Sequence, residues 1–144
     1  MSQRTIELSP LGQMLADFVD HTPGAVASVL VTSDGLVGEF HGLPEEGADT
    51  LAAAVSGIAS LANGVFRDAP GEVQQTVVEH DSGTLFVMRA KVPQQVEGKV
   101  GNLLAVLTND TADAGVVGYA MLQWIDRMHE HLLNPVRTAP RPAQ

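Results

Sequence analysis

The sequence predicts one α/β domain in which five strands form a single sheet and helices cover both of its faces. Segments 25–32 and 102–108 are apolar on both alternating faces, which is typical of strands buried in mid-sheet. Two tight-turn signals, at 33–35 and 81–83, each separate a pair of strand-like segments. Three longer segments have the apolar spacing of helices. The predicted order is therefore helix, two strands, helix, three strands, helix.

The first helix is expected to begin at Ser9-Pro10, because a serine hydroxyl caps a helix and proline suits its first position. It should end at Thr22, since the residue before Pro23 is disfavoured in helical geometry. Its apolar stripe contains Leu11, Met14, Leu15, Phe18 and Val19.

Two hairpins and a last strand supply the sheet. The hairpins pair segment 25–32 with 36–41 and segment 73–80 with 84–92, and the last strand covers 102–108. The first and fifth strands are expected to be neighbours at the centre, which gives the order 2-1-5-4-3. The hydrophobic pattern leaves open the direction of this central pair; the other pairs should be antiparallel.

The last helix is expected to be capped by Asp110 or Thr111, with Asp113 in its first turn. Its core stripe contains Val117, Met121, Trp124, Met128 and Leu132. Asn134-Pro135 should end the ordered chain, so the domain covers 1–134 and a flexible proline-rich tail covers 135–144.

The middle helix, from about Ala48 to Phe66, has no charged residue from position 50 to 66. One side has a normal apolar stripe, which is expected to face the sheet: Leu51, Val55, Ile58, Ala62 and Val65 or Phe66. The other side, which should be charged if it faced water, carries only small residues: Ala53, Gly57, Ser60 and Gly64. Small side chains let a second helix approach closely, and two internal glycines cost about 1 kcal/mol each in an exposed helix.

Packing of this helix against its copy in a second chain is the favoured interpretation, because two-fold dimers present one patch to itself. The main alternative is an alanine-rich helix that is uncharged by chance, or one that is buried within the monomer. A membrane span is disfavoured, because seventeen residues reach about 25 Å and the hydrocarbon core is about 30 Å thick.

Composition excludes several classes of function. Eight basic and seventeen acidic residues give a net charge of −9, which disfavours binding to nucleic acid or to anionic membranes. The chain has no cysteine, so disulfides and thiol chemistry are excluded. The N-terminus has no apolar run that would mark a secretory signal, and a cytoplasmic protein is expected.

The usual signatures of catalysis are missing. The sequence has no phosphate-binding loop of the Gly-x-x-x-x-Gly-Lys-Ser/Thr type, and no nucleophile elbow. The five histidines do not have metal-ligand spacing and are expected at the surface. Glu45, Glu46 and Asp49 are expected just before the middle helix, where its dipole explains them. No catalytic, cofactor-binding or metal-binding residue is therefore predicted.

Several runs, in this order and spacing, resemble the roadblock/dynein-light-chain family over nearly the whole chain apart from the tail. They are FVDHTPGAV (18–26), VTSDGL (31–36), AVSGIASLA (54–62), VVE (77–79), LFV (85–87) and LAVL (104–107). The segment 93–101 is longer than the connection typical of the family, which bears on the partner that is bound.

The resemblance implies the roadblock fold, close to the longin and profilin-like layouts, and a two-fold dimer. Middle helices would pack together and third strands would pair edge to edge into a ten-stranded sheet. The dimer residues it implies are Ala53, Gly57, Ser60, Leu61 and Gly64 on the helix and Val73, Gln75, Val77 and Glu79 within the edge 73–80. It also implies a small Ras-like GTPase as partner, in conservon-type systems with a sensor histidine kinase or in Mgl-type systems. Activators of the latter kind supply no arginine finger, and Arg67 is the only arginine near the middle helix.

Two functions follow as hypotheses. The first is a non-catalytic, dimeric, cytoplasmic adaptor or regulator of a small GTPase in bacterial signalling. The alternative is a small-molecule sensor domain, which would need a pocket with convergent polar groups. Arg89, Lys91 and His80 are the only candidates for such a pocket.

Overall fold

The computed structural model describes residues 8–32, 34–90 and 102–133. The described chain has the predicted order of elements, α-β-β-α-β-β-β-α. The helices are α1 (Pro10–His21), α2 (Glu45–Val65) and α3 (Ala114–Leu133). The strands are β1 (Ala25–Val31), β2 (Val37–His41), β3 (Gln75–His80), β4 (Gly83–Arg89) and β5 (Leu103–Asn109).

The five strands form one sheet in the predicted order β2-β1-β5-β4-β3. Every neighbouring pair is antiparallel, including β1 and β5, whose direction the sequence pattern leaves open. Ser28 lies opposite Val106 and Leu30 opposite Leu104 in this central pair. The two strands that are apolar on both faces therefore occupy the middle of the sheet, where both faces are covered.

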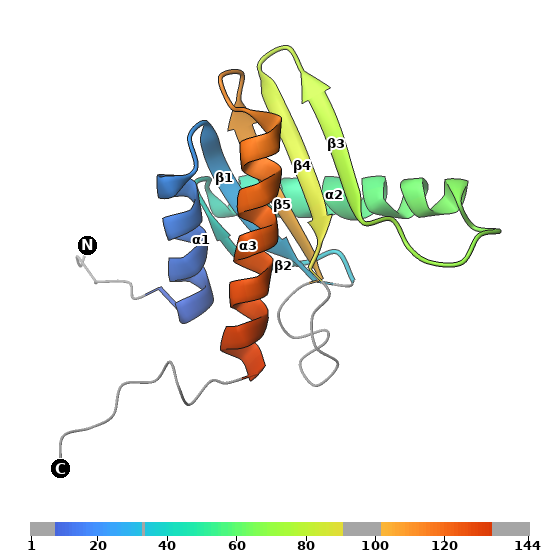
Figure 1. The fold of residues 1–144 in the computed structure, drawn as a ribbon, viewed down its shortest axis with the longest axis horizontal. Helices are drawn as coiled ribbons and strands as arrows, with labels where there is room; N and C mark the ends of the chain where they lie inside the picture. Colours follow the sequence, from blue (N-terminus) through green and yellow to red (C-terminus); the bar gives the residue numbers. More distant parts are fainter. Residues whose placement is uncertain (1–7, 33, 91–101, 134–144) are drawn as a thin grey trace.

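The helices lie in two layers (Figure 1). α1 and α3 cover one face of the sheet, and α2 crosses the other face at a steep angle to the strands. The first face holds the larger core, in which Trp124 is fully buried and donates from Nε1 to the Met14 carbonyl oxygen at 3.0 Å. The second face holds a smaller core around Val29, Val55 and Val87.

Helix starts follow the chemistry of their caps. The Ser9 hydroxyl accepts a hydrogen bond from the Gly12 N–H at 2.9 Å, which confirms the predicted cap of α1. The predicted cap of α3 at Asp110 or Thr111 is wrong. Asp113 takes that role, because its Oδ1 accepts from the Val116 N–H at 3.0 Å, and α3 begins one residue later.

The edge strand β3 is shorter than predicted. It begins at Gln75, and the Val73 N–H donates instead to the Asn63 side-chain oxygen at 2.8 Å, which ties the start of the predicted strand to α2. The last positions of the predicted fourth strand, the long segment 93–101 and the tail from Pro135 lie outside the described residues.

The stripe predicted for α3 is buried, except for Leu132, which is partly buried, and Ile125 joins it. His129 differs from the prediction of a surface histidine. It is half-buried and its ring Nε2 makes a hydrogen bond with the Ala90 carbonyl oxygen, because α3 passes over the end of β4 there.

Candidate dimerisation surface

The start of α2 sets the position of its acidic residues. The helix begins at Glu45 after Pro44, three residues earlier than predicted, so Glu45 and Glu46 lie inside its first turn rather than before it. Negative charge in that turn is favourable with the helix dipole. These carboxylates are exposed, and their position is explained without a catalytic role.

The sheet-facing side of α2 is only partly the one predicted. Val55 is buried, as are Ala48 and Ala52, and the other predicted residues Leu51, Ile58 and Ala62 are half-buried. The expectation that Val65 or Phe66 faces the sheet is wrong, because these side chains are 77% and 61% exposed. The reason is visible in Figure 1, where the C-terminal part of α2 extends past β3, beyond the edge of the sheet.

The opposite side of α2 carries the small residues that the sequence places there. Ala53, Gly57, Ser60 and Gly64 are all exposed, and Leu61 is 76% exposed. A Cβ atom added to either glycine would meet no atom of the described chain within 4 Å. Close packing within the monomer therefore gives no reason for glycine at these two positions.

Strand β3 offers an unpaired edge. In the described part of the chain it pairs only with β4, and Val77 and Val78 are 43% and 41% exposed. The Arg89 N–H donates to the Gln74 carbonyl at 3.0 Å, and hydrogen bonding to a neighbour alternates along an antiparallel strand. The backbone groups of Gln75, Val77 and Glu79 therefore point away from β4, toward the open edge.

The structure brings most of the predicted dimer residues to one side of the molecule. The overhanging end of α2 and the β3 edge lie together on the right in Figure 1. Val73 is the exception among the strand residues, since it precedes β3 and its N–H is already bonded to Asn63. Three exposed apolar residues of this region are absent from the predicted set: Val65, Phe66 and Val78. We name the outward side of α2, these three residues and the β3 edge the overhang surface.

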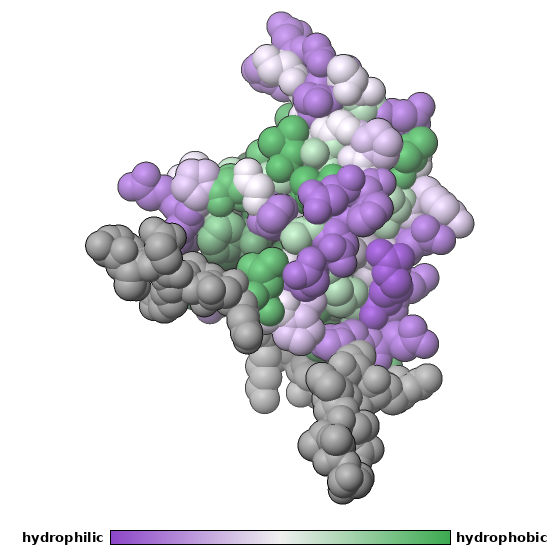
Figure 2. Space-filling model, turned by 90° about the vertical axis from the view of Figure 1, so that its left-hand side faces the viewer, coloured by the Kyte–Doolittle hydropathy of each residue, from purple (hydrophilic) through white to green (hydrophobic). Residues whose placement is uncertain are grey.

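The side of the molecule that bears α1 differs in character (Figure 2). Hydrophilic residues cover much of the described surface there, interspersed with smaller hydrophobic areas. The overhang surface has instead an uncharged helix from Thr50 to Val65 and adjoining exposed valines. Exposed apolar side chains gathered on neighbouring elements are typical of protein–protein contacts.

The candidates for a ligand site do not converge. Arg89 forms an ion pair with Glu72 at 3.1 Å, whereas His80 lies at the far end of the β3–β4 hairpin beside the turn. Lys91 lies outside the described residues. Within 8–32, 34–90 and 102–133 no group of three or more His, Asp or Glu side chains is placed to hold a metal ion. None of the described helices combines the length and apolarity that crossing a membrane requires.

Comparison with known proteins gives one family and several solved structures. The Roadblock/LC7 domain matches residues 11–93. A Roadblock/LC7 domain from Streptomyces avermitilis is 36% identical, with a TM-score of 0.74, over 87% of this chain and 99% of that one. MglB from Myxococcus xanthus has a TM-score of 0.72 at 14% identity, over 90% of this chain and 99% of that one. The gliding protein MglB from Thermus thermophilus has a TM-score of 0.66 at 18% identity, over 90% and 96%. Both MglB likenesses concern the fold alone. No significant match is found among curated proteins.

Proposed function

Because the chain belongs to the Roadblock/LC7 family, we propose that it is a non-catalytic, dimeric regulator or adaptor of a small Ras-like GTPase in a bacterial signalling system. The observation that supports self-association is the overhang surface. The end of α2 extends beyond the sheet edge, and Leu61, Val65 and Phe66 are exposed there. A second copy that packs against them would bury this apolar area.

A two-fold axis beside β3 would use every part of that surface. Two β3 strands would pair through the outward backbone groups of Gln75, Val77 and Glu79, which extends the five strands to ten. Each α2 would then reach over its partner's sheet, and the two rows of small residues centred on Gly57 would face each other. Because both copies use the same patch, assembly through this surface stops at the dimer.

The GTPase partner is inferred from the family resemblance. Regulators of the Mgl type supply no catalytic arginine. Arg67 lies two residues beyond the end of α2 and is exposed, and the proposal assigns it no catalytic role. In this proposal the dimer acts by holding the GTPase in one conformation, and a sensor histidine kinase of the same system is a further candidate partner. The protein itself needs no cofactor for this role.

Two measurements test the proposal separately. Analytical ultracentrifugation at micromolar concentration should give twice the 15.2 kDa of one chain. A pull-down with a small GTPase encoded beside this chain, loaded with GTP or with GDP, should show binding that depends on the nucleotide. A mass of 15.2 kDa would contradict the dimer, whereas a dimer that captures neither form of the GTPase would contradict the regulator role.

A further inference from the structure

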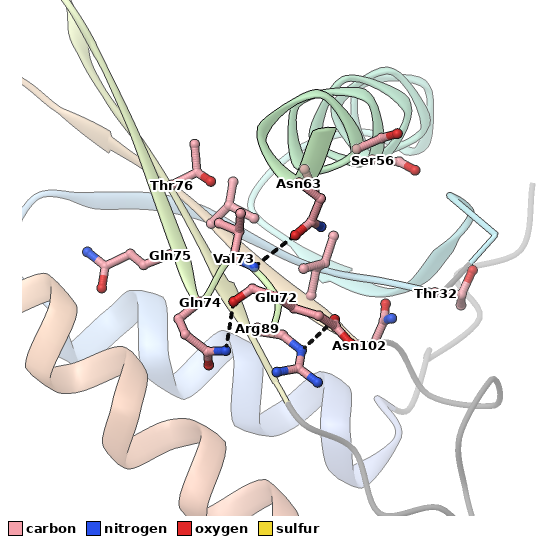
Figure 3. A pocket seen from close by; sticks show the side chains of 14 residues that line it. Thr32, Ser56, Asn63, Glu72, Val73, Gln74, Gln75, Thr76, Arg89 and Asn102 are labelled. Atoms are coloured by element: carbon pink, nitrogen blue, oxygen red, sulfur yellow. Dashed lines mark hydrogen bonds and ion pairs between the residues drawn. The ribbon is translucent and has the colours of Figure 1, made fainter. Parts of the chain in front are cut away.

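Two cavities of about 300 Å³ lie on opposite faces of the sheet. The first lies between α2 and the sheet and is lined in part by Ser60, Val73 and Gln75 (Figure 3), so the α2 of a second copy would cover it in the proposed dimer. The second lies between α1 and α3, on the face opposite α2 (Figure 1), and none of its lining residues belongs to the overhang surface. We call it the α1–α3 cleft, and the proposed dimer would leave it uncovered.

Helical spacing places the polar groups of the α1–α3 cleft. Asp17 and His21 are four residues apart on α1, and Gln123 and Arg127 are four residues apart on α3, so each pair lies on one side of its helix. All four side chains are exposed and therefore accessible to a ligand. Ala120 lies one turn before Gln123, and its small side chain leaves room between the helices. The two helices thus form facing polar walls.

The α1 wall supplies hydrogen-bond acceptors. The His21 Nδ1 lies 2.8 Å from the Asp17 carbonyl oxygen, and Nδ1 carries the proton because a carbonyl oxygen only accepts. In the neutral ring, the His21 Nε2 is then an acceptor. The Asp17 carboxylate accepts from the Gln13 side chain through Oδ1 at 3.0 Å, which leaves Oδ2 available. This wall is suited to a cation that has several N–H donors.

The α3 wall supplies donors. Within the described chain, Arg127 forms no ion pair or hydrogen bond, so its guanidinium donors are unused. Gln123 donates one amide N–H to the Tyr119 hydroxyl at 3.2 Å and has a second N–H. Asp17 and Arg127 therefore line one cleft with opposite charges without pairing to each other. A guanidinium matches the geometry of a carboxylate, so this wall is suited to a carboxylate group.

We propose that the α1–α3 cleft binds a free α-amino acid in its zwitterionic form. The α-carboxylate of the ligand accepts from Arg127, and its α-ammonium group donates to Asp17 and His21. An anion alone would lie beside the Asp17 carboxylate and a cation alone beside Arg127, so a ligand with both charges matches the cleft better than either. The site does not rest on the proposed dimer or GTPase role, because it is formed within one chain. It supplies the sensor hypothesis with polar groups that the sequence did not single out.

L-Leucine is a suitable probe, because two of its derivatives each lack one of its charges. N-acetyl-L-leucine has no ammonium group, and L-leucinamide has no carboxylate. Titrated at millimolar concentration into the isotope-labelled full chain, leucine should shift the backbone NMR signals of Phe18, Ala120 and Gln123 until saturation. Each derivative should bind about tenfold more weakly or less, because it loses one charge-assisted contact. Absence of saturable shifts with leucine, or equal affinity for either derivative, would overturn the proposal.

Two variants and a matched control locate the site. Arg127→Gln and Asp17→Asn each remove one charge of the cleft and should weaken leucine binding about tenfold. Asp20→Asn removes the same charge from an exposed position of α1 outside the cleft and should bind leucine as the wild type does. All three positions are exposed, so the variants should keep the circular dichroism of the wild type. Unchanged affinity in both cleft variants would place leucine elsewhere and overturn the proposal. Ultracentrifugation of the same samples tests the dimer separately, since none of these substitutions touches the overhang surface.

Discussion

At the scale of single residues, some glycines are required because a Cβ atom would clash within the chain, whereas others have open space around them. Some are required by the monomer: a Cβ on Gly83 would lie 2.0 Å from the Thr108 carbonyl oxygen, and one on Gly42 would lie 2.3 Å from that of Val26. Gly57 and Gly64 have open space instead, within a helix where glycine costs about 1 kcal/mol relative to alanine. Their presence is explained if another protein surface packs against them, which is why they support a dimer more strongly than exposure alone.

Gly57→Arg should separate the dimer into monomers that remain folded. The monomer has room for the side chain, but a charged group at the centre of two touching helices would be buried without a partner. Ultracentrifugation should give 15.2 kDa for the variant, with the circular dichroism of the wild type. Gln123→Arg adds the same charge on the exposed side of α3 and should stay dimeric. If Gly57→Arg remained dimeric, the outward side of α2 would not be the contact.

At the scale of elements, α2 and β3 together define the surface. The helix covers the smaller core with its first half and leaves the sheet with its second half, so its exposed apolar end lies beside the strand edge (Figure 1). Backbone hydrogen bonding alternates along β3. The N–H and C=O groups of the even-numbered residues bond to β4 within the chain, whereas those of the odd-numbered residues point to the open edge.

A pair of proline variants tests that alternation. Val77→Pro removes an N–H that points to the open edge, so it should weaken the dimer while the monomer keeps its β4 pairing. Val78→Pro removes an N–H that bonds to β4 and should lower the free energy of unfolding by about 1–3 kcal/mol. Denaturation curves and ultracentrifugation on both variants separate the two effects. Equal loss of stability, with no difference in dimer affinity, would contradict the proposed strand pairing.

At the scale of the whole molecule, the net charge opposes dimer formation and the overhang surface favours it. Each chain has a net charge of −9, so two copies repel each other, whereas the outward side of α2 carries no charge from Thr50 to Val65. Burial of the exposed Leu61, Val65 and Phe66 would supply the attraction. The acidic surface outside this contact remains available to a partner of positive charge.

Dimer affinity should therefore not fall as salt is added. Raising NaCl from about 0.1 M to about 1 M shortens the screening length from about 10 Å to about 3 Å, which reduces repulsion between the chains. An apolar contact is not weakened by this change, so the dissociation constant should stay constant or decrease. Sedimentation equilibrium across that range measures it. A steep increase in the dissociation constant would mean that ion pairs hold the two chains together.

Local patterns were sufficient for much of this fold. Residue type and spacing predict the Ser9 cap, the central position of β1 and β5, the stripe of α3 and the small-residue side of α2. They do so because an element buried on one or two faces has apolar residues at regular intervals in the sequence. The antiparallel direction of β1 and β5 and the exposure of Val65 and Phe66 were decided only in three dimensions. They depend on where elements distant in the chain begin and end relative to one another. The same holds for the cavity of about 300 Å³ at which α2, the segment before β3 and the strand ends meet, because no local sequence pattern predicts that these elements come together.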